Sequence, residues 1–239
     1  MKFRLNMLAS FRNKSVVLVG FEKTNRAFFE RLKTVEGVRI GIADKNPNTQ
    51  VPSSVSTHLG DAYLSRLGEY DVIVRSPGVR YFPELVLLQD RVTTATQLFF
   101  EQVRATSKAK IIAVTGTKGK STTTTLIHNM LEEAGKRSFL VGNIGRQDWD
   151  VVDRVTDNTF IVYEMSSYML QDFTQRPDIA VMLNVHLSHI DWHGTYEAYV
   201  NARLPVQPVG VAVKSVPTAA AVGVIETEPP EGLATVASA

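Results

Sequence analysis

The feature that most constrains the fold is an apolar run that passes directly into a glycine-rich turn and then into a polar stretch. Residues 110–114 predict a buried strand, and residues 120–134 predict a helix. The free backbone N–H groups of the turn between them, together with the helix N-terminus, can surround a phosphate group. In such a loop Lys120 reaches the terminal phosphates, and the Ser121 hydroxyl binds Mg²⁺. The segment therefore predicts a phosphate-binding loop in an α/β domain.

The spacing of this loop departs from the common pattern. A common phosphate loop has a glycine five positions before Gly119, and that position holds Val114. The loop is therefore a shorter variant. The alternative is an ordinary strand-to-helix turn in which the lysine is accidental.

The first hundred residues alternate short apolar runs with amphipathic stretches, which is typical of a parallel sheet covered by helices. A polar joint at residues 106–108 separates a second unit of the same kind. The predicted strands cover residues 15–20, 38–43, 71–75 and 92–95 in the first unit, and 110–114, 139–141, 160–164 and 179–185 in the second. The predicted helices cover residues 24–34, 96–105 and 120–134, and a last one contains residues 196–202.

The composition changes abruptly after residue 203. Residues 204–239 hold half of the 10 prolines and no aromatic residue, so helices and strands cannot extend far there. We expect an irregular stretch, for which two explanations compete. One is a natural flexible tail, and the other is translation in a wrong reading frame beyond about Arg203, which we favour because the pattern ends just after an unfinished helix.

Composition excludes several classes of protein and site. The chain has no cysteine, so disulfides, thiolate zinc sites and cysteine nucleophiles are impossible. The net charge is +2 without a basic block, so we expect no nucleic-acid partner. The apolar run at residues 16–19 is too short for a signal peptide or a membrane span. We therefore expect a cytoplasmic protein without a membrane partner.

Four segments together resemble the Mur ligases, the enzymes that build the peptide stem of bacterial peptidoglycan. Residues 115–122 read Thr-Gly-Thr-Lys-Gly-Lys-Ser-Thr, like the ATP loop of that family, and residues 142–145 read Gly-Asn-Ile-Gly. Residues 164–170 look like the family's Glu-x-Ser-Ser-aromatic-Gln-Leu motif, with methionine replacing the glutamine. Residues 184–191 resemble its Asn-Val-x-x-Asp-His-x-Asp segment, with Ser188 replacing the first aspartate. The resemblance covers residues 12–203.

The resemblance implies a two-domain α/β fold. We expect a Rossmann-like parallel-sheet domain at residues 1–107 that binds a UDP-linked substrate, and a partial P-loop-type α/β ATPase domain at residues 108–203. It also implies two cofactors, ATP and Mg²⁺. The ATP-binding residues would be Gly116, Thr117, Lys118, Gly119, Lys120, Ser121 and Thr122. Mg²⁺ would be bound by Ser121, Glu164 and His189, and the catalytic residues would be Lys120, Glu164 and His189.

Two of these positions also have other interpretations. Glu164 ends a predicted strand, where it could be a solvated carboxylate instead of a Mg²⁺ ligand. His189 lies in a cluster with His186, Asp191 and His193 that could bind zinc, although the spacing fits no known metal motif. We expect His186 and His193 to be surface residues.

The resemblance assigns the UDP-linked substrate mainly to the first domain. The residues at the matching positions are Thr24, Asp44, Lys45 and Ser76, with Asn143 from the second domain. Glu22 and Asn25 stand where the family has glycines, and Arg203 stands where it has a carbamylated lysine that helps to bind a second Mg²⁺. A guanidinium cannot become that anionic ligand.

The activity that the resemblance implies is ATP-dependent amide ligation in peptidoglycan precursor synthesis. The Gly-Lys-Ser and Glu-x-Ser-Ser features favour the branch of the family that adds D-glutamate to UDP-N-acetylmuramoyl-L-alanine through an acyl phosphate. Because the family has three domains, we expect this chain to be a monomeric, inactive fragment. The alternatives are a non-catalytic nucleotide-binding homologue and another amino-acid ligase of the same family.

Overall fold

The computed structural model describes residues 7–186, 188–202 and 223–226, and these form two compact units. The first unit contains the chain up to Thr106 together with Gln147–Asp153, and the second contains Ser107–Arg146 and the chain from Arg154 onward. Arg203 and most of residues 204–239 lie outside the described residues.

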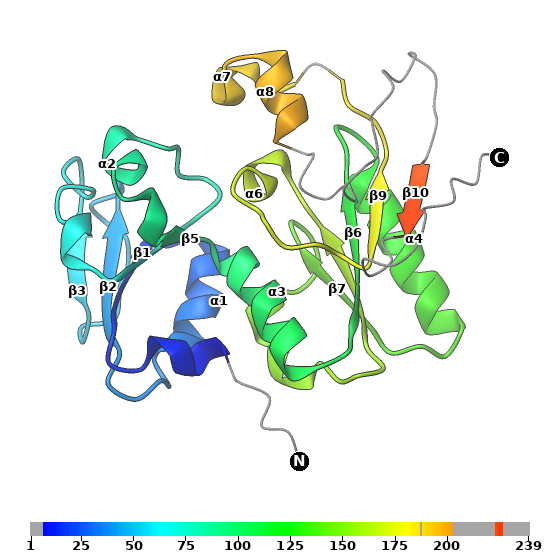
Figure 1. Cartoon of the computed structure of the whole chain (residues 1–239), viewed down its shortest axis with the longest axis horizontal. Coiled ribbons are helices and arrows are strands. Elements are labelled where there is room, and N and C mark those ends of the chain that lie inside the picture. Colours follow the sequence, from blue (N-terminus) through cyan, green and yellow to red (C-terminus); the bar gives the residue numbers. More distant parts are fainter. Residues whose placement is uncertain (1–6, 187, 203–222, 227–239) are drawn as a thin grey trace. The chain divides into compact units, whose positions relative to one another are not determined.

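The first unit is built on a five-stranded parallel sheet with the order β3-β2-β1-β4-β5 (Figure 1). This order matches five strands of the doubly wound Rossmann order 3-2-1-4-5-6, in which the strand order reverses beside the first strand. β1, the central strand of this sheet, is buried at every position. The strands are β1 (Ser15–Val19), β2 (Arg39–Asp44), β3 (Ser56–Leu59), β4 (Val72–Arg75) and β5 (Val92–Thr93).

Helices of the first unit bury aromatic side chains against this sheet. The α-helices are α1 (Lys23–Leu32), α2 (Pro83–Val86), α3 (Ala95–Thr106) and α5 (Asp148–Val151). Short 3-10 helices span Met7–Phe11, Leu67–Glu69, Gln89–Arg91 and Val152–Arg154, the last at the border of the two units.

Helix α5 belongs to the first unit although its sequence lies between two strands of the second. Trp149 is fully buried, with ring centroids 4.8 Å from Phe28 of α1 and 6.0 Å from Phe99 of α3. Its indole N–H donates to the carbonyl oxygen of Ala95 at 2.9 Å. The carbonyl of Trp149 in turn accepts from Arg31 Nε at 3.1 Å, and Arg31 also pairs with Asp153. The segment therefore completes the core of the first unit.

The second unit has a sheet with the order β10-β9-β6-β8-β7, parallel except for β10 at one edge. Its strands are β6 (Lys110–Thr115), β7 (Ser138–Gly142), β8 (Phe160–Glu164), β9 (Ile179–Met182) and β10 (Gly223–Glu226). Its helices are α4 (Lys120–Glu133), α6 (Ser167–Leu170), α7 (Ile190–His193) and α8 (Tyr196–Asn201). The predicted α/β fold class, with two mainly parallel sheets, is confirmed.

Three strands differ from the sequence-based expectation. β9 ends at Met182, three residues before the predicted end at residue 185, because the chain there turns to bind the glycine-rich loop. β3 was not expected, since its sequence is Ser-Thr-His-Leu and it lies exposed at the sheet edge. β10 lies within the stretch expected to be irregular. None of the described helices has the length and apolar character needed to span a bilayer.

Candidate nucleotide and metal site

The loop between β6 and α4 depends on two glycines. Gly116 has a φ of +151°, and a Cβ there would lie 3.0 Å from Leu183 Cβ and 3.3 Å from the backbone of Asn184. Gly119 has a φ of +82° and is the N-cap of α4. Any larger side chain would strain the backbone at both positions and would collide with the 183–184 segment at the first. Because these positions have no side chain, the backbone of the loop can come close to neighbouring residues and to a ligand.

Asn184 holds this loop from the neighbouring strand end. The N–H of Thr117 donates to Asn184 O at 2.8 Å, and the N–H of Lys118 donates to Asn184 Oδ1 at 2.9 Å. The amide of Asn184 donates back to Lys118 O at 3.0 Å. These reciprocal bonds satisfy backbone groups that would otherwise need water, and they fix the loop before any ligand is present.

Lys120 is the first residue of α4, and its ammonium group lies over the loop. Nζ donates to Gly116 O at 2.8 Å and to Thr117 O at 3.1 Å. Ser121 and Thr122 follow on the first helical turn and are exposed. The seven residues expected to bind ATP thus form one continuous turn, with the positive end of a 14-residue helix behind it.

Glu164 ends β8 beside this loop. The register pairs it with Val114 of β6, so both lie at the carboxyl edge of the sheet. The carboxylate is 1% exposed, and Oε1 accepts from the Asn143 amide at 2.9 Å. Among the described residues, Oε2 is buried without a hydrogen-bond partner. A buried carboxylate oxygen without a partner is costly, and a hard cation such as Mg²⁺ would satisfy it.

His189 has a left-handed backbone with φ +54°, and its Nδ1 forms a 2.6 Å hydrogen bond with the Tyr168 hydroxyl. This bond orients the exposed ring and leaves Nε2 as the nitrogen that could bind a metal. Ser121, Glu164 and His189 all follow carboxyl ends of strands in the second unit. The structure therefore places the three expected Mg²⁺ ligands on one edge of this sheet.

The histidine cluster offers no zinc site in the part of the chain that the structure describes, where no group of three or more His, Asp or Glu side chains could hold a metal ion. His186 is exposed, as expected. His193 was also expected to be a surface residue, and it is only partly exposed. Its half-buried ring stacks on Tyr168 with an interplanar angle of 4°, and its Nε2 lies 3.1 Å from Ser167 Oγ.

Tyr199 of α8 was not among the residues expected at the site. It is fully buried, and its hydroxyl forms a 2.8 Å hydrogen bond with Thr117 Oγ1. The same Oγ1 accepts from the His186 N–H at 2.9 Å. Tyr199 therefore connects α8 to the glycine-rich loop. The connection spans 82 residues of sequence, so no local pattern could indicate it.

The first unit brings together the ends of β1, β2 and β4. Both carboxylate oxygens of Asp44 accept backbone N–H groups, Oδ2 from Phe21 at 2.7 Å and Oδ1 from Asn46 at 2.9 Å. The N–H of Ser76 donates to Val19 O at 2.8 Å. Two of the residues expected to bind the substrate thus also hold the turns in place.

The other three expected substrate residues have different environments. Thr24 is half-buried in the first turn of α1, and Lys45 is exposed just after β2. Asn143 belongs to the second unit, where its backbone N–H and its side-chain amide both donate to Glu164. Asn143 therefore orients the candidate metal ligand.

Asn25, at a position where the resemblance implies a glycine, has a structural role. It is fully buried, and its amide donates to the carbonyl oxygens of Val19, Gly20 and Val74 at 3.3, 2.8 and 3.2 Å. The side chain thus satisfies carbonyls at the ends of two strands. It fills space that glycine leaves open in a nucleotide-binding turn.

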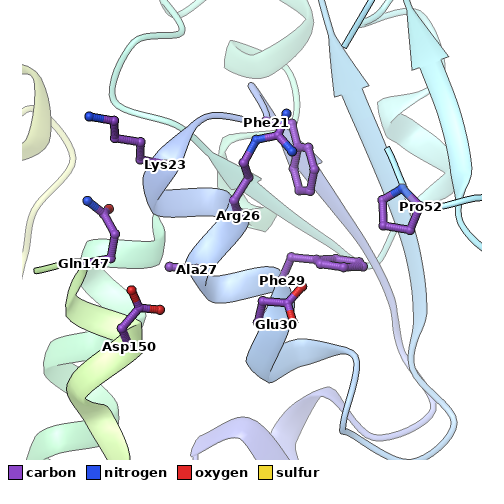
Figure 2. A pocket seen from close by; sticks show the side chains of 9 residues that line it. All are labelled: Phe21, Lys23, Arg26, Ala27, Phe29, Glu30, Pro52, Gln147 and Asp150. Atoms are coloured by element: carbon purple, nitrogen blue, oxygen red, sulfur yellow. The ribbon is translucent and has the colours of Figure 1, made fainter. Parts of the chain in front are cut away.

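A pocket of about 440 Å³ lies over the outer face of α1 (Figure 2). Arg26 extends over it, with the guanidinium carbon 4.3 Å from the centroid of the Phe21 ring and Nη1 on Gln50 O at 3.2 Å. The pocket does not include the four first-unit residues expected to bind the substrate. Its lining consists of Phe21, Lys23, Arg26, Ala27, Phe29, Glu30, Pro52, Gln147 and Asp150.

Residues 114–206 match the Mur ligase middle domain. The UDP-N-acetylmuramoylalanine--D-glutamate ligase of Acetivibrio thermocellus is 35% identical over 204 residues, which is 80% of this chain and 43% of the relative. The enzyme of the same name from Clostridium acetobutylicum is 32% identical over 213 residues, which is 85% of this chain and 46% of the relative.

Among solved structures, the UDP-N-acetylmuramate:L-alanyl-gamma-D-glutamyl-meso-diaminopimelate ligase from Neisseria meningitides has a TM-score of 0.45 at 19% identity. That alignment covers 79% of this chain and 66% of the other. The chain spans less than half the length of the two curated relatives. The chain therefore contains a match to the Mur ligase middle domain and is similar in sequence to part of two D-glutamate ligases.

Proposed function

We propose that this chain provides the nucleotide-binding parts of an ATP-dependent ligase that joins D-glutamate to UDP-N-acetylmuramoyl-L-alanine. The observation that carries the proposal is the pairing of the Gly116–Lys120 loop with a buried Glu164 whose Oε2 has no partner among the described residues. The names of the relatives support the choice of substrates. This is a step of peptidoglycan precursor synthesis, and thus of cell-wall growth and division, for which we expect a cytoplasmic monomer.

The geometry of the second unit suits phosphoryl transfer from ATP. The N–H groups at the N-terminus of α4 bind the phosphates, and the Lys120 ammonium leaves Gly116 O and Thr117 O to contact the terminal ones. Ser121, Glu164 and His189 would hold Mg²⁺, which neutralises phosphate charge when it is bound. Asn143 keeps the Glu164 carboxylate in place through its 2.9 Å hydrogen bond.

The reaction then proceeds in two balanced steps. A carboxylate oxygen of UDP-N-acetylmuramoyl-L-alanine attacks the γ-phosphorus of ATP, a phosphorus–oxygen bond forms, and ADP leaves. The amine of D-glutamate attacks the carbonyl carbon of the acyl phosphate, the amide bond forms, and inorganic phosphate leaves as the amine loses a proton. Lys120 stabilises the charge on the transferred phosphoryl group in the first step.

The first unit would bind the uridine nucleotide. Thr24, Asp44, Lys45 and Ser76 are the proposed contacts, with Asn143 from the second unit. Support comes from the hydrogen bonds that gather the ends of β1, β2 and β4, since open α/β sheets bind ligands at the carboxyl ends of their strands.

The metal part of the proposal can be tested by calorimetric titration of residues 1–239 with ATP, with and without Mg²⁺. We expect Mg²⁺ to tighten ATP binding, and we expect Glu164→Gln to weaken Mg·ATP binding about tenfold, or about 1.4 kcal/mol, because the neutral amide cannot balance the cation. Binding of ATP without Mg²⁺ should not change. Glu133→Gln, at an exposed glutamate that ends α4, is the matched control. An unchanged Mg²⁺ dependence in Glu164→Gln would contradict the proposed ligand.

The ligase part is tested by ADP release. Residues 1–239 match less than half of the relatives' length, so we expect them to bind Mg·ATP and UDP-N-acetylmuramoyl-L-alanine without D-glutamate-dependent ADP release. ADP release that requires D-glutamate would show that this stretch suffices for ligation. Failure to bind either nucleotide would contradict the proposed function.

A further inference from the structure

Arg75 is the last residue of β4, directly before the Ser-Pro-Gly turn at residues 76–78. It pairs with Val19 in the parallel register between β4 and β1. Its side chain is fully buried, among the largest buried side chains of the protein. Because arginine is almost never fully buried without hydrogen-bond partners, its surroundings should explain why the charge is kept there.

The guanidinium group binds the turn from inside. Nη1 donates to the carbonyl oxygen of Ser76 at 3.3 Å and to that of Val79. The N–H of Val79 donates to Ser76 O at 3.0 Å, which closes the turn. The guanidinium carbon also lies 4.8 Å from the centroid of the Tyr81 ring. One side chain therefore contacts both ends of the turn and the segment that follows it.

The outer side of the turn packs against Gly20, which follows β1. A Cβ at Gly20 would lie 2.7 Å from Val79 Cγ2 and 2.9 Å from Ser76 Cβ, so the two turns are in close contact. A Cβ at Gly78 would lie 3.7 Å from Glu22 Oε2, which places the turn beside the start of α1 as well. A displacement of the 76–79 turn would therefore change the sheet edge where the nucleotide is proposed to bind.

We propose that Arg75 is a positioning residue for the nucleotide: it fixes the 76–79 turn in the shape that receives the diphosphate of the UDP-linked substrate. This inference rests on the proposed function of the first unit. The planar guanidinium can direct donors to two carbonyl oxygens while its face packs on an aromatic ring. A lysine ammonium has the charge but lacks the planar fork, so it can replace this arrangement only in part.

The test compares UDP with uridine, which lacks the diphosphate, in titrations of residues 1–239 and of the variants Arg75→Gln and Arg75→Lys. We expect Arg75→Gln to weaken UDP binding about tenfold, which corresponds to about 1.4 kcal/mol, and to change uridine binding less than about twofold. Arg75→Lys should recover part of the loss. Mg·ATP binding should be unchanged in both variants and shows that the second unit is folded, and the retained uridine binding shows that the first unit is folded.

Each outcome has a defined meaning. Absence of UDP binding by the unmodified chain would contradict the proposed function of the first unit and this inference with it. UDP binding that Arg75→Gln leaves unchanged would contradict the inference alone, and so would an equal loss of UDP and uridine binding, since that indicates general destabilisation. If Arg75→Gln does not fold, the result for Arg75→Lys tests the inference. The inference requires Arg75→Lys to bind UDP more weakly than the unmodified chain does, with a smaller change in uridine binding.

Discussion

The segment from β1 to α1 and the segment from β6 to α4 share a strand-turn-helix topology. They differ in the side chain that binds the carbonyl oxygens of the turn. β1 and β6 are each flanked by parallel strands, and each is followed by a glycine with positive φ, Gly20 at +77° and Gly116 at +151°. In the first segment the buried amide of Asn25 satisfies the carbonyls at the strand end. In the second segment, the ammonium group of Lys120 donates to the loop carbonyl oxygens of Gly116 and Thr117.

The difference indicates which turn is built for an anion. The amide of Asn25 is fixed in the interior, and if it moved, the carbonyls of Gly20 and Val74 would lose it as a donor. The ammonium of Lys120 sits on a flexible stem that can turn from the loop carbonyls to a phosphate. The same topology thus gives a permanent structural bond in the first unit and an exchangeable one in the second.

The largest expected effect is on stability, and it depends on how deeply the side chains around α1 and α4 are buried. α1 packs against Trp149, whereas α4 carries Leu126 and Met130 with exposures of 55% and 70%. We expect Trp149→Ala to destabilise the first unit by about 3–5 kcal/mol, and Met130→Ala to change stability by less than about 0.5 kcal/mol. Hydrogen exchange of β1 and β6 peptides separates the two units. Protection of β1 that survives Trp149→Ala would refute the packing argument.

The next effect concerns the lysines that begin the two helices. Lys120→Ala should weaken Mg·ATP binding about 100-fold, or about 2.7 kcal/mol, because the charge that leaves the loop for the phosphates is lost. Lys23→Ala is the matched control, since Lys23 is the first residue of α1, and it should leave ATP binding within about twofold. Calorimetric titration measures both. Equal losses in the two variants would show that the turns do not differ as described.

Smaller effects are expected when Asn25 and Asn184 are replaced, and the two replacements should affect different properties. Asn25→Ala removes a donor from the carbonyls of Gly20 and Val74, while Val19 O keeps the Ser76 N–H. The change should lower the stability of the first unit by about 2 kcal/mol, seen as a shift of the denaturant midpoint. Asn184→Ala, which releases the glycine-rich loop, should mainly weaken Mg·ATP binding, by about fivefold, or about 1 kcal/mol. A reversal of these two readouts would contradict the assignment of the first turn to structure and the second to binding.

The smallest effect is a pH dependence that both units should share. In the first unit the Asp71 carboxylate accepts from the N–H and the hydroxyl of Ser15, and these bonds lower the pKa of Asp71. In the second unit the Glu132 carboxylate accepts from the hydroxyl and the N–H of Ser138, and these bonds lower the pKa of Glu132. The sequence distance between partners is 56 residues in the first pair and six in the second.

Since each folded pKa lies below the unfolded value, the unfolded chain binds more protons, and stability is lost as the pH falls. The loss should begin near the unfolded pKa values, 4.5 for Glu132 and 3.8 for Asp71, and continue below them. Thermal melts between neutral pH and pH 3 should show a shallower decline for Glu132→Gln and Asp71→Asn. A decline as steep as that of the unmodified chain would exclude both pairs as its source.

Much of the fold was predictable because local sequence patterns indicate its buried strands. The buried strands β1, β6 and β8 are continuous apolar runs, and each lies within a residue or two of its predicted bounds. β3 could not be found in this way, since an exposed edge strand needs no apolar residues. The end of β9 depends on the loop that Asn184 binds, which no periodicity shows.

The candidate site likewise has parts that could be predicted from the sequence and parts that could not. The glycine-rich loop was predictable because its chemistry lies within one short stretch of sequence. The hydrogen bond between Thr117 and Tyr199, and the position of Asn143 on Glu164, join distant residues and required the structure. Residues 147–153 would be assigned to the second unit by their place in the sequence, and only the buried ring of Trp149 shows that they belong to the first.

That placement of Trp149 has a consequence for the order in which the protein is made. The ribosome releases residues from the N-terminus, so all five strands of the first unit emerge while the indole that fills its core is still unsynthesised. The first unit must therefore wait for residue 153, by which point β6, α4 and β7 of the second have also emerged. The N-terminal domain cannot finish folding first, and a nascent chain halted near residue 107 would lack part of its own interior.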